Sequence, residues 1–260
     1  MPPADPALLR VGAFELCWSG VFLALGLALA YVVTRAAATR RGLAPAVVRD
    51  LVLWSLPEAL LTARVVYALG HPEIYFVAPS RLVQLWDGGY SFGAGLLVGT
   101  WAVWRYARHR GLSAATALDA AVPGLLIGQG LAALGRALGV ITQPVASLPP
   151  WDQPAGGAAV SPSAAAESLG WRDAALQGHV FVALWALALL FAYAACARRD
   201  LAPGGVFRAY LLLQALGQIA LRLLAAQTGP ADLLGVAAWT AIAVAAALSA
   251  RYHPRSAQKT

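Results

Sequence analysis

Three arginines lie in or beside apolar stretches of the sequence, where a charged side chain is costly and marks a candidate functional site. Arg64, Arg136 and Arg222 each fall near the end of such a stretch that we expect to face outward. Because a guanidinium group holds a phosphate through two parallel hydrogen bonds, the three predict a site for a lipid phosphate near the outer leaflet. Two alternatives stay open: each arginine snorkels separately to the headgroups, or Glu15 and Glu58 neutralise one or two of them.

A histidine adds a titratable group at the same face. His179 opens a later apolar stretch, next to a long outer loop, and is the histidine best placed to act as a general base. His109 and His253 instead lie with basic clusters that we expect on the cytoplasmic side. A position at headgroup level without any chemical role is the alternative interpretation of His179.

The remaining polar groups in apolar stretches favour structural roles. Asp119 lies near the start of one stretch, where a carboxylate suits the positive end of a helix. Three glutamines are expected to hydrogen-bond between helices: Gln129, Gln214 and Gln218. Cys17 and Cys196 lie inside apolar runs, which excludes a disulfide framework and a zinc site.

The composition indicates which elements must position these groups. Apolar residues make up 60% of the 260 residues and charged residues 12%, whereas a soluble domain has roughly 45–50% and 25%. So few charged side chains cannot cover the surface of a soluble protein. The sequence therefore predicts an integral membrane protein, and Met1–Arg10 does not resemble a cleavable signal peptide.

Seven stretches are long enough to cross a membrane core, which takes roughly 20 apolar residues in a helix. They are Val11–Thr34, Ala46–Leu69, Tyr90–Tyr106, Thr116–Leu134, His179–Ala197, Val206–Gln227 and Leu233–Ala250. We expect an all-α protein with about seven transmembrane helices in a single polytopic domain over residues 1–260. A long segment between the fourth and fifth helices, about residues 135–178, is rich in Ala, Pro and Gly and is predicted to be an outer loop.

Most of the 19 basic residues fall on one side of these stretches. They follow the first, third, fifth and seventh stretches: Arg35, Arg40, Arg41 and Arg49, then Arg105, Arg108 and Arg110, then Arg198, Arg199 and Arg208, then Arg251, Arg255 and Lys259. The positive-inside rule makes that side cytoplasmic, with the N-terminus outside and the C-terminus inside. The net charge of +7 therefore reflects membrane topology, and nucleic-acid binding is excluded. The absence of a visible internal repeat argues against an inverted-repeat transporter.

The order of short motifs resembles one known family. Residues Trp86–Gly99 are similar to the W-x-G-G-x-S-F-H-G-G-L-x-G segment of bacterial prolipoprotein diacylglyceryl transferases. Other landmarks follow in the family's order. Cys17–Gly20 resembles R-W-Y-G, and Ala63–Tyr67 with His71-Pro72 resembles A-R-L-x-Y…H-P. Gly128-Gln129 and Gly135-Arg136 resemble G-Q…G-R, Pro150-Trp151 and Arg172 fall in the outer loop as in the family, and Tyr210–Gln218 resembles Y-L-L-x-Y-G-x-x-R. The resemblance covers nearly the whole chain.

The resemblance implies a seven-span protein of the bacterial cytoplasmic membrane, with its N-terminus outside and its active site at the outer leaflet. The family transfers a diacylglyceryl group from phosphatidylglycerol to the lipobox cysteine thiol in the signal peptide of a preprolipoprotein, and releases glycerol 1-phosphate. Such a reaction needs a cationic cradle for the phosphate and help in forming the thiolate. It calls for no metal and no organic cofactor.

Several family positions carry other residues in this chain. Gly93 stands for the family's histidine, Ser19 for its tyrosine, and Gln218 for its sixth-span arginine. Arg222 stands for the downstream glutamate. In the run Gly135–Pro144, Gln143 can represent a family amide only with a one-residue slip, and Pro144 replaces the glutamate.

Two interpretations follow from these replacements. In the first, the site has been rebuilt: Arg136 and His179 are catalytic, and Arg64, Arg136, Arg222, Gln143 and Gln218 bind the lipid headgroup. Arg222 lies one helical turn from Gln218 on the same face and supplies the lost guanidinium. In the second, the protein is a non-catalytic relative that binds an anionic phospholipid or a lipoprotein partner. A small-molecule permease ranks third, because the polar groups gather toward the outer face instead of mid-membrane.

Overall fold

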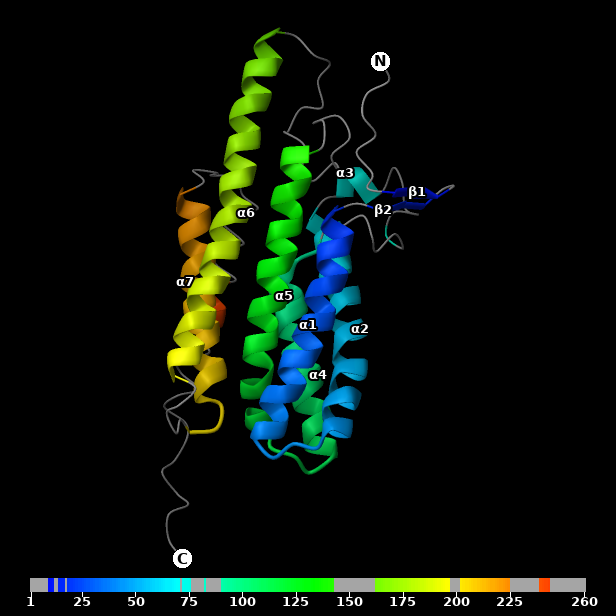
Figure 1. The fold of residues 1–260 in the computed structure, drawn as a ribbon, viewed down its shortest axis with the longest axis vertical. Helices are drawn as coiled ribbons and strands as arrows, with labels where there is room; N and C mark the ends of the chain where they lie inside the picture. The colour runs from blue at the N-terminus through cyan, green and yellow to red at the C-terminus, as the bar shows by residue number, and fades with distance from the viewer. Residues whose placement is uncertain are drawn as a thin grey trace, which may run out of the picture.

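The computed structural model describes residues 9–11, 14–16, 18–70, 72–75, 82, 90–142, 162–196, 202–224 and 239–243. Long helices dominate these residues (Figure 1). The helices are α1 Trp18–Arg40, α2 Pro45–Gly70, α3 Pro72–Tyr75, α4 Phe92–His109, α5 Ala114–Thr142, α6 Pro162–Cys196 and α7 Gly205–Leu224, and residues 239–243 are also helical. Two short strands, β1 Leu9–Val11 and β2 Phe14–Leu16, precede α1.

Among the described residues, four segments are long and apolar enough to cross a membrane: Gly20–Arg40, Pro45–Gly70, Ala114–Thr142 and Leu176–Ala195. A shorter apolar helix covers Gly205–Leu221. The prediction of a helical, multi-pass membrane protein is therefore confirmed. Each of the first six predicted stretches corresponds to a long helix, whereas most of the seventh, Leu233–Ala250, lies outside the described residues.

The predicted boundaries of two segments were wrong. The first stretch was expected to begin at Val11, but β1 and β2 pair as an antiparallel hairpin and the helix begins only at Trp18. Apolar and polar residues alternate in these strands, and the register places Arg10 opposite Glu15, a pattern that suits a strand pair better than a helix. In the predicted outer loop at 135–178, α5 continues to Thr142 and α6 begins at Pro162, where proline suits the first turn of a helix.

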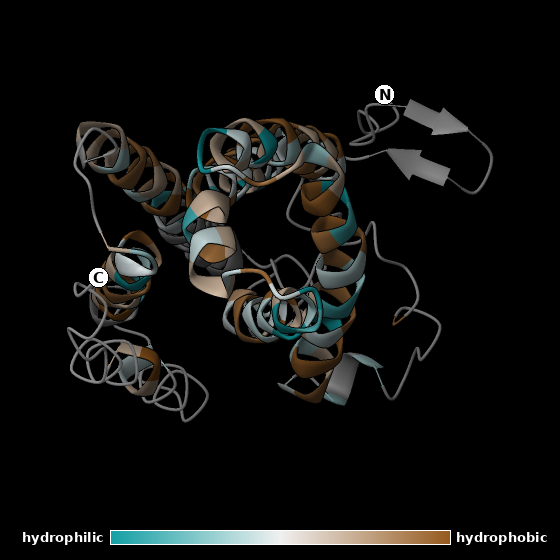
Figure 2. Ribbon diagram, turned by 90° about the horizontal axis from the view of Figure 1, so that it is seen from below, coloured by the Kyte–Doolittle hydropathy of each residue, from teal (hydrophilic) through white to brown (hydrophobic). Residues whose placement is uncertain are grey.

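Small residues let the helices approach closely. At Gly124 of α5, an added Cβ would lie 2.5 Å from the backbone oxygen of Ala30 in α1, and closer still to the Thr34 hydroxyl. An added Cβ at Gly95 of α4 would meet the Ala63 Cβ of α2 at 3.2 Å. Tight contact between backbones of this kind is typical of helix packing in membranes. Viewed end-on, α1, α2, α4 and α5 surround a common centre, with α6 and α7 to one side (Figure 2).

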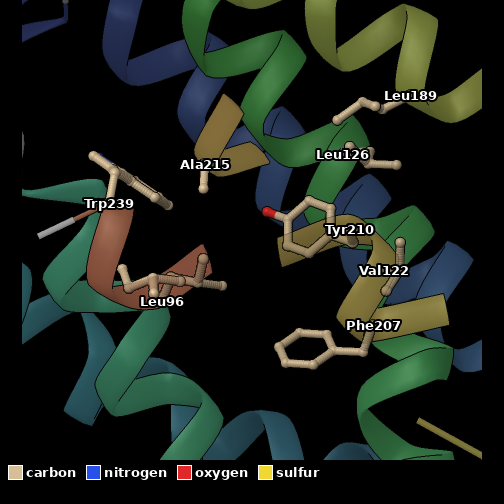
Figure 3. Close-up of a cluster of buried hydrophobic side chains, with 9 residues drawn as sticks. Leu96, Val122, Leu126, Leu189, Phe207, Tyr210, Ala215 and Trp239 are labelled. Atoms are coloured by element: carbon tan, nitrogen blue, oxygen red, sulfur yellow. The ribbon is translucent and has the colours of Figure 1, made fainter. Parts of the chain in front are cut away.

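The largest buried cluster lies where α4, α5, α6, α7 and residues 239–243 meet. It consists of Leu96, Val122, Leu126, Leu189, Phe207, Tyr210, Ala215, Trp239 and Ile242 (Figure 3). The cluster joins the α6–α7 pair to the other helices.

The short turns at 41–44, 110–113 and 202–204 all lie at one end of the bundle, which we call the basic end (Figure 1). Asp119 ties this end together. Its carboxylate accepts hydrogen bonds from the backbone N–H groups of Gly204 and Phe207, both at 2.7 Å, and contacts Arg41 at 3.4 Å. The prediction that Asp119 suits a helix N-terminus is confirmed in kind, but the helix that it caps is α7, which begins at Gly205.

Candidate functional site

Arg64 lies near the end of α2 that is remote from the basic end, and its side chain is 1% exposed. Its guanidinium carbon is 5.3 Å from the ring centroid of Tyr75 and 5.7 Å from that of Tyr90. A hydrogen bond from the Ser91 N–H to the Ala63 carbonyl, 2.9 Å long, fixes the start of α4 beside this position. Two aromatic rings therefore hold a buried cation, an arrangement that stabilises it once it is removed from water.

The suggested neutralising acids can now be placed in part. Glu58 forms an ion pair with Arg105 of α4, so its carboxylate is directed to that arginine. The side chain of Glu15 lies outside the described residues.

Arg136 and His179 are brought together by the packing of α5 against α6. An added Cβ at Gly130 of α5 would lie 3.6 Å from the Ala186 Cβ of α6, so the two helices approach closely at these residues. Arg136, in the last two turns of α5, is near enough for its charge to act on the His179 imidazole. The two residues chosen from the sequence as a phosphate ligand and a base therefore lie in the same region of the fold.

Helix α7 reaches the same region. An added Cβ at Gly178, next to His179, would lie 4.0 Å from Cδ1 of Leu221. Arg222 follows Leu221 in α7, although its side chain lies outside the described residues. Gln218 is half-buried one turn earlier. The backbone therefore brings four of the predicted site positions into one neighbourhood: Arg136 on α5, His179 on α6, and Gln218 and Arg222 on α7.

At Gly93, in the first turn of α4, the structure shows what takes the place of the histidine implied by the resemblance. A Cβ added to Gly93 would lie 3.4 Å from Cζ2 and 4.0 Å from Nε1 of Trp239. The Trp239 indole is buried (Figure 3). It stacks on Phe92, with ring centroids 6.2 Å apart. The indole therefore packs directly against the backbone at position 93.

Two of the predicted interhelical hydrogen bonds are not formed with described residues. The amides of Gln129 and Gln214 are buried without a hydrogen-bond partner in the described part of the chain, and Gln214 is 0% exposed. The Tyr210 hydroxyl, one turn before Gln214 on α7, is also buried without a hydrogen-bond partner among the described residues. A buried polar group left unpaired costs about 1–3 kcal/mol, so these atoms are candidates for contact with a polar ligand. Tyr210 and Gln214 were not among the candidate site residues predicted from the sequence, although their four-residue spacing with Gln218 puts all three on one face of α7.

Some predicted positions cannot be placed. Gln143 and Pro144 lie outside the described residues, and Ser19 is described only as part of the backbone of α1. Of the residues predicted from the sequence, those that the structure places in the candidate site are Arg64 with its two tyrosines, and Arg136 and His179 beside α7.

Comparisons with known proteins agree with the motif order. The family model described as LGT, prolipoprotein diacylglyceryl transferase, matches residues 6–252. A protein of Halalkalibacterium halodurans is 33% identical over 134 residues, which cover 52% of this chain and 45% of that protein. One of Lactiplantibacillus plantarum is 31% identical over 132 residues, covering 51% and 47%, and one of Gloeobacter violaceus is 31% identical over 132 residues, covering 50% and 48%. All three are named phosphatidylglycerol–prolipoprotein diacylglyceryl transferase. The chain spans about half the length of the curated relatives it matches.

Proposed function

The chain belongs to the prolipoprotein diacylglyceryl transferase family, and we propose that it transfers a diacylglyceryl group from phosphatidylglycerol to the lipobox cysteine of a preprolipoprotein. The observation that carries the proposal is that Arg136 of α5 and His179 of α6 lie in one neighbourhood beside α7, where an added Cβ at Gly178 would lie 4.0 Å from Cδ1 of Leu221. The relatives' names supply the substrates, and the pair supplies groups that suit the chemistry.

In the proposed reaction, the cysteine sulfur forms a bond to the terminal glyceryl carbon of the diacylglyceryl group. The bond between that carbon and the phosphate oxygen breaks, and glycerol 1-phosphate leaves. His179 accepts the thiol proton, because the thiolate is the nucleophile. Arg136 stabilises the negative charge on the departing phosphate, which is the usual role of a fixed cation in such a step.

Arg64 contributes to headgroup binding in this proposal. Tyr75 and Tyr90 fix its guanidinium on two sides, which lowers the entropic cost of holding the phosphate in one orientation. The side chains of Gln218 and Arg222 add polar contacts from α7, and Gln143 adds a further contact from the segment after α5.

The orientation of the protein follows from its basic end. We place the turns at 41–44, 110–113 and 202–204 on the cytoplasmic side of the bacterial cytoplasmic membrane, because short basic connections stay on that side. Arg64 and Arg136 then lie toward the outer leaflet, where a preprolipoprotein signal peptide presents its cysteine.

One observation favours a second candidate function, a non-catalytic relative that binds an anionic phospholipid. The position at which the family has a histidine carries no titratable group here, and Trp239 packs against Gly93, with Cζ2 3.4 Å from the place of an added Cβ. In that case Arg64 and Arg136 bind the lipid, and no bond is broken.

Release of glycerol 1-phosphate, measured by mass spectrometry with phosphatidylglycerol and a lipobox peptide, separates the two candidates. We expect the wild-type protein to release it, and His179→Ala and Arg136→Ala to lower the rate at least tenfold. His109→Ala is the matched control, since His109 is an exposed histidine at the basic end. Release that is absent from the wild-type protein, with the lipid still bound, would select the non-catalytic function.

A further inference from the structure

Toward the basic end, one exposed face of α4 carries a leucine, two tryptophans and an arginine in that order. Leu97, Trp101, Trp104 and Arg108 follow one another at intervals of three or four residues, so they share one side of the helix. We call these four residues the Trp104–Arg108 face. Leu97, Trp101 and Trp104 are 52%, 51% and 45% exposed, so this side points away from the bundle.

Two arginines at this face are held over indole rings. The guanidinium carbon of Arg108 is 5.1 Å from the ring centroid of Trp104, and that of Arg105 is 4.7 Å from the centroid of Trp101. A cation fixed over an aromatic ring has already lost part of its conformational freedom. The face is therefore organised before any ligand binds.

Three of the arginines around this face form ion pairs with carboxylates, whereas Arg108 forms none with the described residues. Arg105 is paired with Glu58, and Arg49 and Arg110 are both paired with Asp50. Among the residues that the structure describes, no carboxylate lies within ion-pair distance of Arg108. Arg108 is exposed, so its positive charge is available to an anion outside the protein.

The order of groups along the face matches the order of groups in a phospholipid. Leu97 offers an aliphatic surface deeper in the membrane, the two indoles lie at the depth where aromatic side chains meet the headgroup region, and Arg108 follows at the end of the helix. In a phospholipid, the acyl chains, the ester region and the phosphate follow one another in the same order from the membrane core outward.

We propose that the Trp104–Arg108 face binds an anionic phospholipid of the leaflet at the basic end. The phosphate lies on Arg108, the ester region packs against the two indoles, and an acyl chain lies along Leu97. This site lies at the end of the bundle opposite Arg64 and Arg136, and it does not depend on the transferase function. The bound lipid is a structural ligand instead of a substrate.

The test is native mass spectrometry of the purified full chain in neutral detergent, titrated with phosphatidylserine or with phosphatidylcholine. We expect preference for phosphatidylserine and a loss of about fivefold in its affinity in Arg108→Gln, since a basic residue near an anionic headgroup contributes about that factor. Trp104→Leu should weaken binding as well, and Arg108→Lys should weaken it less than Arg108→Gln. Arg40→Gln is the matched control, because Arg40 is an exposed arginine in the last turn of α1 at the same end.

Each other outcome overturns the proposal. Equal losses in Arg108→Gln and Arg40→Gln would mean attraction to net charge without a site, and no loss in Arg108→Gln would exclude the face. Loss of phosphatidylserine binding in Arg136→Ala alone would place the lipid in the proposed substrate site. A dimer peak that disappears in Trp104→Leu, without lipid preference, would mean that a second copy of the chain covers the face.

Discussion

Replacement of Gly93 by histidine restores the residue type of the family and should nevertheless destabilise this protein. The Cβ of any side chain at position 93 would lie 3.4 Å from the Trp239 ring, which is ordinary contact for one carbon, and we expect the larger imidazole to be crowded by the ring. Trp239 is 5% exposed and stacked on Phe92, so its ring cannot move aside without loss of packing. Overpacking of this kind costs about 1–3 kcal/mol.

The control for this prediction is Gly93→Ala, which adds the Cβ alone. We expect it to be neutral or slightly stabilising, because alanine has a higher helix propensity than glycine and the added carbon meets the ring at an ordinary distance. The free energy of unfolding of each variant is measured in mixed micelles by titration with a denaturing detergent.

A double variant completes the argument. Trp239→Ala alone should cost about 3–5 kcal/mol through the cavity that it leaves. In combination with Gly93→His, the imidazole occupies part of that cavity, so the double variant should be more stable than the sum of the single changes predicts, by at least about 0.5 kcal/mol. Strict additivity, or a Gly93→His variant as stable as the wild type, would refute the claim that the indole crowds a histidine at this position.

Three further predictions concern other contacts. Asp119→Ala removes a buried carboxylate that caps α7 and pairs with an arginine, so it should lower the free energy of unfolding by about 3–5 kcal/mol in the same assay. Asp50→Ala, at a more exposed carboxylate, should lower it by less than about 1 kcal/mol. Gly124→Ala should destabilise by about 1–3 kcal/mol because its Cβ collides with α1, and Gly139→Ala, where nothing lies within 4 Å, should not. Arg136→Ala should abolish the thermal stabilisation that phosphatidylglycerol gives to the protein, and Arg136→Lys should restore it only in part, since an ammonium cannot form the paired hydrogen bonds of a guanidinium. Unchanged stabilisation in Arg136→Ala would remove Arg136 from the site.

The general architecture could be predicted from the sequence because the membrane imposes strong and simple constraints. Apolar length identified the long helices, and the distribution of arginines placed the turns at 41–44 and 110–113 on one side. The hairpin before Trp18 was missed because each strand is only three residues long, so its alternation of apolar and polar residues is too short to stand out beside the apolar helix that follows. The early start of α6 was missed because residues 162–178 were read as a continuation of the loop, although Pro162 and the alanines after it favour a helix.

The candidate site was predictable only where a residue's type carried the argument. Arginines and a histidine at the ends of apolar stretches are unusual enough to be noticed, and the structure brings Arg136 and His179 together. The contact between Gly93 and Trp239 joins segments far apart in the sequence, and neither residue type signals chemistry. The glutamines were misjudged for a related reason: whether Gln129 and Gln214 find partners depends on how the neighbouring helices are rotated, which the sequence does not specify.

The central claim is that this chain performs diacylglyceryl transfer, and the mass of a lipobox peptide tests it most directly. The peptide is incubated with the purified protein and phosphatidylglycerol, and its mass is then measured. We predict a gain of one diacylglyceryl group on the cysteine, and no gain on a matched peptide with serine at that position. An unchanged peptide mass, in a preparation that still binds phosphatidylglycerol, would contradict the claim.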